Sequence, residues 1–164
     1  MFREMRRKKQ LLSEEESIAM LKNCNEGVLA VLGDEGYPYA VPLNHAYHEG
    51  KLYFHGAIEG HKLDAIKNCD KVSYCVIEKR DIVPEDVTTY FRSVIAFGRA
   101  RLVTDPEEKR AALFLLGRRH AAEYEAKWTK EIEEAFARTG VIEVTIEHLT
   151  GKECIELVKA RQTK

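Results

Sequence analysis

The stretch YFHGAIEGHKLDAI, residues 53–66, changes within a few positions from the pattern of a strand to that of a helix. The preceding Leu52 and the first residues of the stretch are apolar and favour a strand, whereas Leu63 and Ile66 recur one helical turn apart. Two glycines and two histidines stand at the junction together with Lys62. The stretch therefore predicts a strand followed directly by a crossover helix.

The junction carries side chains that suit a bound phosphate. A helix N-terminus presents unpaired N–H groups and partial positive charge. Gly60 permits close approach of the backbone, and Lys62 and His61 add a charge and a donor. A plain helix start with a solvated Lys62 fits the residues about as well, because no known phosphate-loop pattern is present. His55, at the strand end, suits ligand binding or proton transfer, although a lone strand histidine is more often a satisfied polar residue.

Short strands joined by turns surround this junction. The apolar run at 27–33 is bounded by glycines, and a DEG turn signal follows it. Pro38 and Pro42 exclude a regular central strand in the next segment, and Gly98 marks a bulge or bend in a long strand. The expected strands are 27–33, 37–49, 51–56, 71–78, 90–103 and 141–149, with Ile142, Val144, Ile146 and His148 on one face of the last.

Helical segments flank these strands. Ser13 and Glu16 form a capping box at the start of the first helix. Asp105 caps a helical excursion over 105–138 that holds two helices or one kinked helix. Many short strands with turn signals indicate a mainly β fold, a small antiparallel barrel with flanking helices, in one domain over residues 1–164. A parallel doubly wound sheet is disfavoured because most strands have no helix between them.

Composition limits the classes of function. A chain of 164 residues with 45% hydrophobic residues suits one globular domain, and a net charge of -1 gives no overall attraction to nucleic acid. No apolar run is long enough to span a bilayer, and the N-terminus has no apolar signal core. We therefore expect a cytoplasmic protein that binds neither nucleic acid nor membrane. The basic tail at 1–10 is expected to be a solvated arm.

Metal and thiol chemistry are disfavoured. The four cysteines form no C-x-x-C pair, so we expect free thiols and no metal site. His45 and His48 are three apart on a predicted strand and should point to opposite faces. The sequence has no G-x-S-x-G nucleophile elbow and no evident pair of carboxylates. Any chemistry is therefore expected to depend on a cofactor.

Other polar residues lie on the predicted strands. Near Pro42, the strand has an irregular edge whose backbone, with the Asn44 amide, could bind a planar heterocycle, although a plain barrel-rim strand is the more economical interpretation. Arginine side chains on the long strand could bind phosphate, but a solvated face explains Arg99 and Arg101 better. The GRRH segment at 117–120 suits a helix C-terminus, and we assign it no function.

Taken in order, several segments resemble the flavin-binding split-barrel proteins related to pyridoxamine 5'-phosphate oxidase, and more narrowly their nitroimidazole-resistance branch. The segments are MRRKK, GVLAVLGDEGYPYAVPLNHAY, KLYFHGAIEGHKLDAIKNCDKVSYCVIE, YFRSVIAFGRARLV and LTGKE. The resemblance covers nearly the whole chain. It implies a six-stranded antiparallel split barrel that forms a homodimer, with one FMN in each of two clefts between the subunits and FAD as the other flavin to consider.

The resemblance also implies roles for individual residues. His55 would lie near the flavin and the substrate, as the catalytic residue. His61 stands where arginine is expected in many relatives, which would weaken phosphate binding or make it depend on imidazole protonation. The implied cofactor-binding residues are Val41, Pro42, Leu43 and Asn44 along the isoalloxazine edge, His55, then Gly60, His61, Lys62 and Leu63 around the phosphate, and Arg92 and Ser93 completing the cleft.

The activity implied is that of an FMN-dependent oxidoreductase that passes electrons from a donor such as a nicotinamide to a small-molecule acceptor. A nitroimidazole is the acceptor to expect, and its reduction would confer antibiotic resistance. Pyridoxamine phosphate oxidation is a weaker alternative, because the chain lacks a C-terminal extension of the kind such oxidases use. A non-enzymatic module that carries or senses flavin or haem is the third possible function. The sequence leaves the physiological donor and acceptor open.

Overall fold

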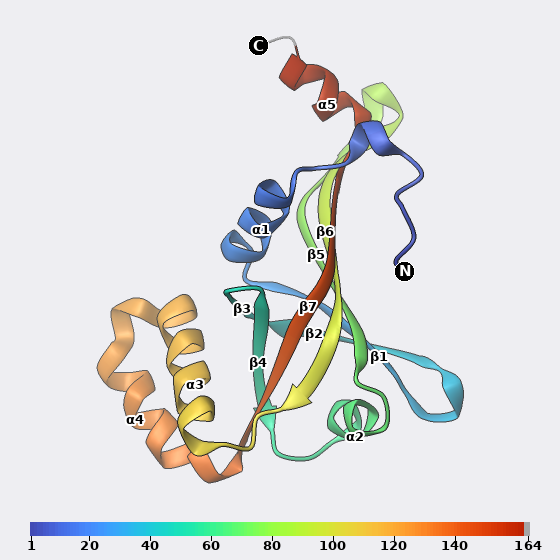
Figure 1. The fold of residues 1–164 in the computed structure, drawn as a ribbon. Coiled ribbons are helices and arrows are strands. Elements are labelled where there is room, and N and C mark those ends of the chain that lie inside the picture. Colours follow the sequence, from blue (N-terminus) through green and yellow to red (C-terminus); the bar gives the residue numbers. More distant parts are fainter. Residues whose placement is uncertain (163–164) are drawn as a thin grey trace.

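Within the described chain, residues 1–162 of this computed structural model, seven strands form one antiparallel sheet in the order β2-β1-β5-β6-β7-β4-β3. The fold is mainly β with flanking helices, as the sequence predicts (Figure 1). The strands are β1 (Glu26–Leu32), β2 (Pro38–Asn44), β3 (Ala46–His48), β4 (Lys51–Ala57), β5 (Lys71–Val83), β6 (Thr88–Leu102) and β7 (Thr139–Glu153).

The sheet curls into a barrel at His45. β2 and β3 are the two edges of the sheet, yet His45 alone separates them in the chain. β2 pairs with β1 and β3 pairs with β4, so one stretch of chain joins both edges. The predicted single strand at 37–49 is therefore wrong, since it changes partner at His45. This break turns the six expected strands into seven without changing the class of fold.

A bulge lies beside Gly98, as predicted. The register of β6 and β7 shifts between Phe97 and Gly98, which leaves Glu147 as an extra residue on β7. A Cβ at Gly98 would lie 2.2 Å from the Thr145 carbonyl oxygen, so the close approach requires glycine. The extra residue reverses the alternation, and His148 stacks on Phe2 while Ile146 packs against the core. The prediction that Ile146 and His148 share a face is therefore wrong.

Helices close the ends and one side of the barrel. α2 covers one end, the pair α3–α4 lies beside β3 and β4, and α5 lies at the other end near the β5–β6 turn (Figure 1). The predicted capping box of Ser13 and Glu16 is present, and Asp105 caps α3. The sequence did not predict α5, nor the extension of β5 beyond residue 78. The helices are α1 (Glu14–Asn23), α2 (His61–Asn68), α3 (Pro106–Ala121), α4 (Glu125–Ala135) and α5 (Ile155–Gln162).

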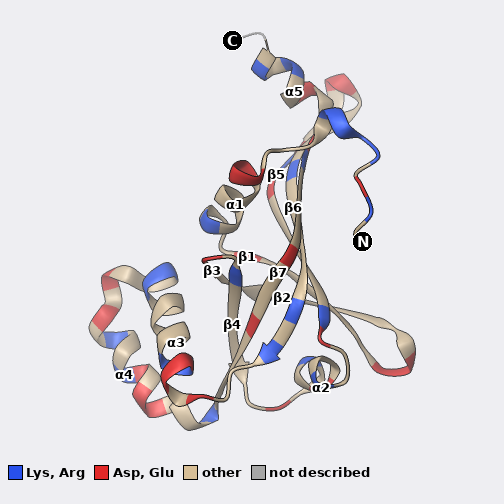
Figure 2. Ribbon diagram, in the orientation of Figure 1, with Lys and Arg blue, Asp and Glu red and all other residues tan. Residues whose placement is uncertain are grey.

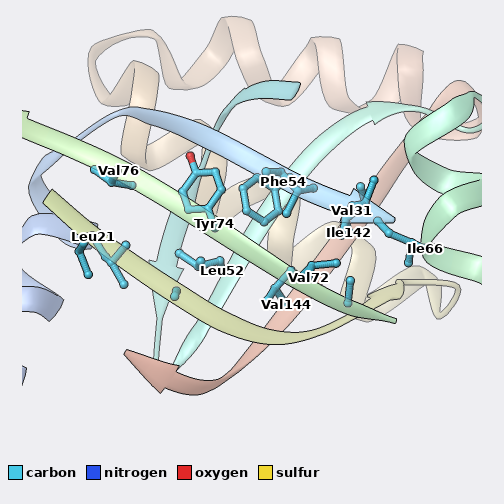
Figure 3. Packing of buried hydrophobic residues seen from close by; sticks show 14 of the residues in the cluster. Leu21, Val31, Leu52, Phe54, Ile66, Val72, Tyr74, Val76, Ile142 and Val144 are labelled. Atoms are coloured by element: carbon cyan, nitrogen blue, oxygen red, sulfur yellow. The ribbon is translucent and has the colours of Figure 1, made fainter. Parts of the chain in front are cut away.

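The core fills the inside of the barrel (Figure 3). Phe54 from β4 and Tyr74 from β5 are fully buried and meet edge to face, with ring centroids 4.9 Å apart. Aliphatic side chains from β4, β5 and β7 surround the two rings. A second cluster, which includes Leu113 and Val141, lies beneath α3 and fixes the helical pair to the outside of β7.

The N-terminal tail is only partly the solvated arm that the sequence predicts. Its basic side chains are exposed, but Gln10 is buried and Leu11 forms a β-bridge with Lys152. Phe2 stacks on His148 with ring centroids 4.7 Å apart, so the tail lies against β7. Of the helices within residues 1–162, none is long and apolar enough to cross a membrane.

Candidate functional site

A split opens in the barrel where its two edges separate below His45. Within residues 1–162, β2 pairs only with β1, and the part of β4 beyond Tyr53 pairs only with β7. Two unpaired strand edges, β2 and the end of β4, therefore border the split. The chain leaves β4 at Ala57 and enters α2 at His61, so the N-terminus of this helix stands at the same opening.

The start of α2 provides free backbone donors. Gly60 caps the helix with φ of 131°, a conformation that favours glycine, and no side chain occupies its cap. The N–H of Leu63 donates to the Gly60 carbonyl at 2.9 Å, which leaves the first two helical N–H groups, of His61 and Lys62, without an intrahelical acceptor. The Leu63 side chain is only 2% exposed. Leu63 thus anchors the helix in the core and does not itself face the split.

The two basic side chains of this turn lie on opposite borders of the split. Lys62 folds back over β4, because its Nζ and Cε lie 3.5 Å from where a Cβ on Gly56 would stand. His61 reaches β2, where its ring stacks on Tyr39 at a centroid distance of 4.3 Å. Its Nε2 is also 3.6 Å from the exposed carboxylate of Asp34. The first turn of α2 therefore bridges the two strand edges.

The edge strand β2 alternates between core and solvent. Val41 and Leu43 pack against the barrel core, whereas Pro42 and Asn44 are exposed. The Leu43 carbonyl also accepts a hydrogen bond from the Tyr74 hydroxyl at 2.8 Å. At this edge, Val41 and Leu43 therefore offer a ligand mainly backbone atoms, because their side chains are partly buried, whereas Pro42 and Asn44 can offer their side chains.

His55 lies in a pocket of about 310 Å³ between the end of β4 and the pair α3–α4. A second imidazole, that of His120 from α3, lines the same pocket and donates from Nε2 to the His45 carbonyl oxygen at 3.0 Å. Partial burial lowers the pKa of His55 and of His120. The lining residues are Asn44, His55, Leu113, Leu116, Gly117, His120, Trp128, Glu131, Ile132, Ala135 and Thr139.

Sequence reasoning missed His120, because no local pattern places a residue near the end of α3 beside the end of β4. One signal was available at Gly117, a glycine inside a helix. A Cβ there would lie 2.6 Å from the Trp128 ring, so Gly117 lets α4 pack closely against α3. That close contact forms the outer wall of the pocket.

Arg92 and Ser93 lie far from α2 within one chain. Leu102 on β6 pairs with Ile142 on β7. Ile142 pairs in turn with Phe54 on β4, the residue before His55. Arg92 precedes Leu102 by ten residues, which is about 33 Å of extended strand. Its guanidinium also contacts the carboxylates of Glu16, Glu78 and Glu153. A single chain therefore does not bring this pair to the split.

The other two arginines of β6 form ion pairs with carboxylates, and Figure 2 shows basic and acidic positions on the neighbouring strands β6 and β7. Arg99 contacts Asp70 and Glu147, and Arg101 contacts Glu143 and Glu108. Burial would raise the pKa of Glu143, but hydrogen bonds from Arg101 and Lys51 hold it below its usual value. Within residues 1–162, no three His, Cys, Asp or Glu side chains gather as metal ligands.

A curled antiparallel sheet that opens along one seam, with a crossover helix starting at the opening, defines a split barrel. The chain belongs to the pyridoxamine 5'-phosphate oxidase family, because the model of that family matches residues 13–153. A search of curated protein sequences found no match.

Many solved structures share this fold, among them the following three. A candidate 5-nitroimidazole antibiotic resistance protein from Bacteroides thetaiotaomicron is 23% identical, over 87% of this chain and 86% of its own, with a TM-score of 0.72. An FAD-binding protein from Mesorhizobium loti is 24% identical, over 88% and 97%, with a TM-score of 0.62. A flavocytochrome from Azotobacter vinelandii is 21% identical, over 96% and 78%, with a TM-score of 0.75. At these identities the likeness concerns the fold alone.

Proposed function

We propose that this protein is a flavin-dependent oxidoreductase that binds FMN, with its phosphate at the N-terminus of α2. The start of α2 at the split carries the proposal: two N–H groups without intrahelical acceptors, Gly60 in a glycine-favouring conformation, and Lys62. Within residues 1–162, no carboxylate lies within 4 Å of the Lys62 ammonium, so its charge remains available for an anion. These residues fit the phosphate of a flavin mononucleotide.

The flavin site is proposed to be shared between two copies of the chain. Arg92 and Ser93 can reach such a site only from a second copy, given their distance from α2. The outer face of the sheet supports pairing, because Val28, Ile77 and Ile95 are 40%, 55% and 39% exposed. Val28 on β1 and Ile95 on β6 both pair with Cys75 on β5, so the two residues are aligned across the three strands. Light scattering in the presence of FMN should give a dimer, and a monomer would rule out the shared cleft.

The proposed reaction reduces the nitro group of a nitroimidazole to an amine. A bound flavin would supply the redox chemistry that connects a nicotinamide donor with the nitro group. Overall, three reduced nicotinamides and three protons convert one nitro group to an amine and two waters. Lys62 and the α2 N–H groups hold the phosphate, the β2 edge orients the ring system, and His55 lies nearest the acceptor.

Titration with FMN tests the site directly. Lys62→Ala should weaken FMN binding about 10- to 150-fold, because a hydrogen bond to a charged phosphate contributes about 1.5–3 kcal/mol. Lys67→Ala is the matched control, since Lys67 is on the same helix and pairs with Asp64 at 2.9 Å. Equal FMN affinity in the two variants would contradict the phosphate assignment. Parallel titration with FAD distinguishes the two flavins, and binding without turnover would indicate a flavin-carrying module.

A further inference from the structure

The pocket beside His55 has a polar end and an apolar wall. Asn44, His55 and His120 form the polar end, and apolar side chains from α3 and α4 form the wall, which also includes the polar residues Glu131 and Thr139. Its volume of about 310 Å³ is near the lower limit for small-molecule sites, about 300 Å³. The apolar residues of the wall are Leu113, Leu116, Ile132 and Ala135, and the Trp128 ring lies beside them.

His120 is held in one orientation and one tautomer. Its Nε2 lies 3.0 Å from the His45 carbonyl oxygen, which can only accept, so the proton must be on Nε2. The preceding Arg119 donates to the carbonyls of Asn23 and Cys24, which fixes the same end of α3 to the barrel. In the neutral ring Nδ1 of His120 is unprotonated, and no group within residues 1–162 donates a hydrogen bond to it. This nitrogen can accept a hydrogen bond but cannot donate one.

Asn44 and His55 complement this acceptor. The pocket is also lined by the Glu131 carboxyl, the Thr139 hydroxyl and Trp128, whose buried Nε1–H has no hydrogen-bond partner within residues 1–162. The Asn44 side chain can donate from its amide nitrogen, and His55 can donate from whichever ring nitrogen carries the proton. The polar end of the pocket therefore matches a ligand edge that has both a donor and an oxygen acceptor. The Trp128 ring and the apolar side chains match a flat ring.

Resting on the function proposed above, we propose that this pocket binds the electron acceptor and that Nδ1 of His120 selects acceptors with a ring N–H. The preferred class is a small planar nitro-substituted heteroaromatic ring with an unsubstituted N–H. Its N–H donates to His120, and its nitro oxygens accept from Asn44 and His55. An analogue alkylated at that ring nitrogen lacks the donor and leaves His120 without a partner.

Trp128 offers a readout that requires neither flavin nor turnover. It is the single tryptophan of the chain and lines the pocket, and a bound nitro compound quenches indole fluorescence. The full-length protein is titrated with 2-methyl-5-nitroimidazole and with its N1-methyl derivative, before and after addition of FMN. Free N-acetyltryptophanamide corrects for absorption by the probes. Wild-type protein should bind the N–H probe about two- to tenfold more tightly, the range for one neutral hydrogen bond.

Variants of His120 assign the preference to its nitrogen. His120→Leu should bind both probes equally, whereas His120→Gln, which keeps an acceptor, should retain part of the preference. His48→Leu is the matched control, because His48 is an exposed histidine outside this pocket. A preference that persists in His120→Leu, or the lack of saturable quenching by either probe, would overturn the proposal. Quenching without FMN binding would preserve the pocket and refute the flavin function, so the two failures are distinguishable.

Discussion

Acid should destabilise the fold through His45, the residue that joins the two edges of the barrel. Its side chain is 0% exposed, with Nε2 2.7 Å from the Leu21 carbonyl oxygen and Nδ1 2.9 Å from the Tyr74 hydroxyl. The carbonyl requires a proton on Nε2, so in the neutral ring Nδ1 is an acceptor. The Tyr74 hydroxyl has one proton, which it can donate either to Nδ1 or to the Leu43 carbonyl but not to both.

Protonation of His45 would satisfy this network better but would bury a charge. The charged ring donates from Nδ1 to the Tyr74 oxygen, while the hydroxyl donates to Leu43. That extra hydrogen bond contributes about 1–3 kcal/mol, whereas a buried charge without a counter-ion costs several kcal/mol. Within residues 1–162, no carboxylate pairs with His45. Burial therefore dominates and lowers the pKa of His45 to about 4.

The sign and size of the effect follow from linkage. The unfolded imidazole has a pKa of about 6.5, so between pH 6.5 and 4 the unfolded chain binds more protons than the folded one. The contribution of the neutral His45 to the free energy of unfolding is thus fully present above about pH 6.5 and falls as the pH decreases towards 4. The loss due to His45 is about 2 kcal/mol at pH 5 and about 3 kcal/mol at pH 4.

Urea denaturation at about pH 7 and about pH 5 measures this loss, with His45→Gln as the variant that cannot titrate. Because burial also lowers the pKa of His55 and His120, the informative quantity is the difference between wild type and variant. NMR titration of the His45 ring in the wild-type protein is the second measurement, should the variant not fold. A His45 ring that titrates at pH 6.5 or above, or equal acid losses in the two proteins, would refute the reasoning.

Two further substitutions test the sheet. Gly98→Ala should destabilise the protein by about 1–3 kcal/mol, because the new Cβ would lie 2.2 Å from the Thr145 carbonyl oxygen; an unchanged urea midpoint would contradict this contact. Glu143→Gln should cost about 2 kcal/mol near neutral pH, since the buried carboxylate holds Lys51 and Arg101. The lowered pKa of Glu143 means that its contribution is lost as the pH falls through the folded pKa, so the two proteins should converge in acid. The exposed Glu147→Gln is its control, and an equal loss there would show that burial of the carboxylate is unimportant.

Local signals predicted the elements whose causes are local. Ser13 and Glu16 satisfy each other's backbone donors, and Asp105 caps the helix that follows it, so both helix starts could be placed from a few neighbouring residues. Gly98 similarly marked a close approach, although the extra residue of the bulge lies on the opposite strand at Glu147. A single strand cannot show which of its partners absorbs a bulge.

Features that depend on closure of the barrel could not be predicted. The chain changes its partner strand at His45 only because the sheet curls until its edges meet. The alternation of apolar residues around His45 gives no indication of this change. At the candidate site, the start of α2 and its apolar face at Leu63 and Ile66 followed from sequence, whereas the inward direction of Val41 and Leu43 did not. His120 reaches the pocket through the packing of α3 against the barrel, which involves contacts far apart in the chain.

His45 connects closure of the barrel with the shape of the pocket. Its side chain bonds to the Leu21 carbonyl and the Tyr74 hydroxyl inside the barrel, and its own carbonyl accepts from His120 outside. The same peptide therefore fixes where the two sheet edges meet and which nitrogen of His120 carries a proton. A substitution that moves the His45 backbone should alter ligand selection by His120 even where the pocket walls are intact. In His45→Gln, a reduced preference for the N–H probe, measured through Trp128, would reveal this coupling, and an unchanged preference would show that the two roles are independent.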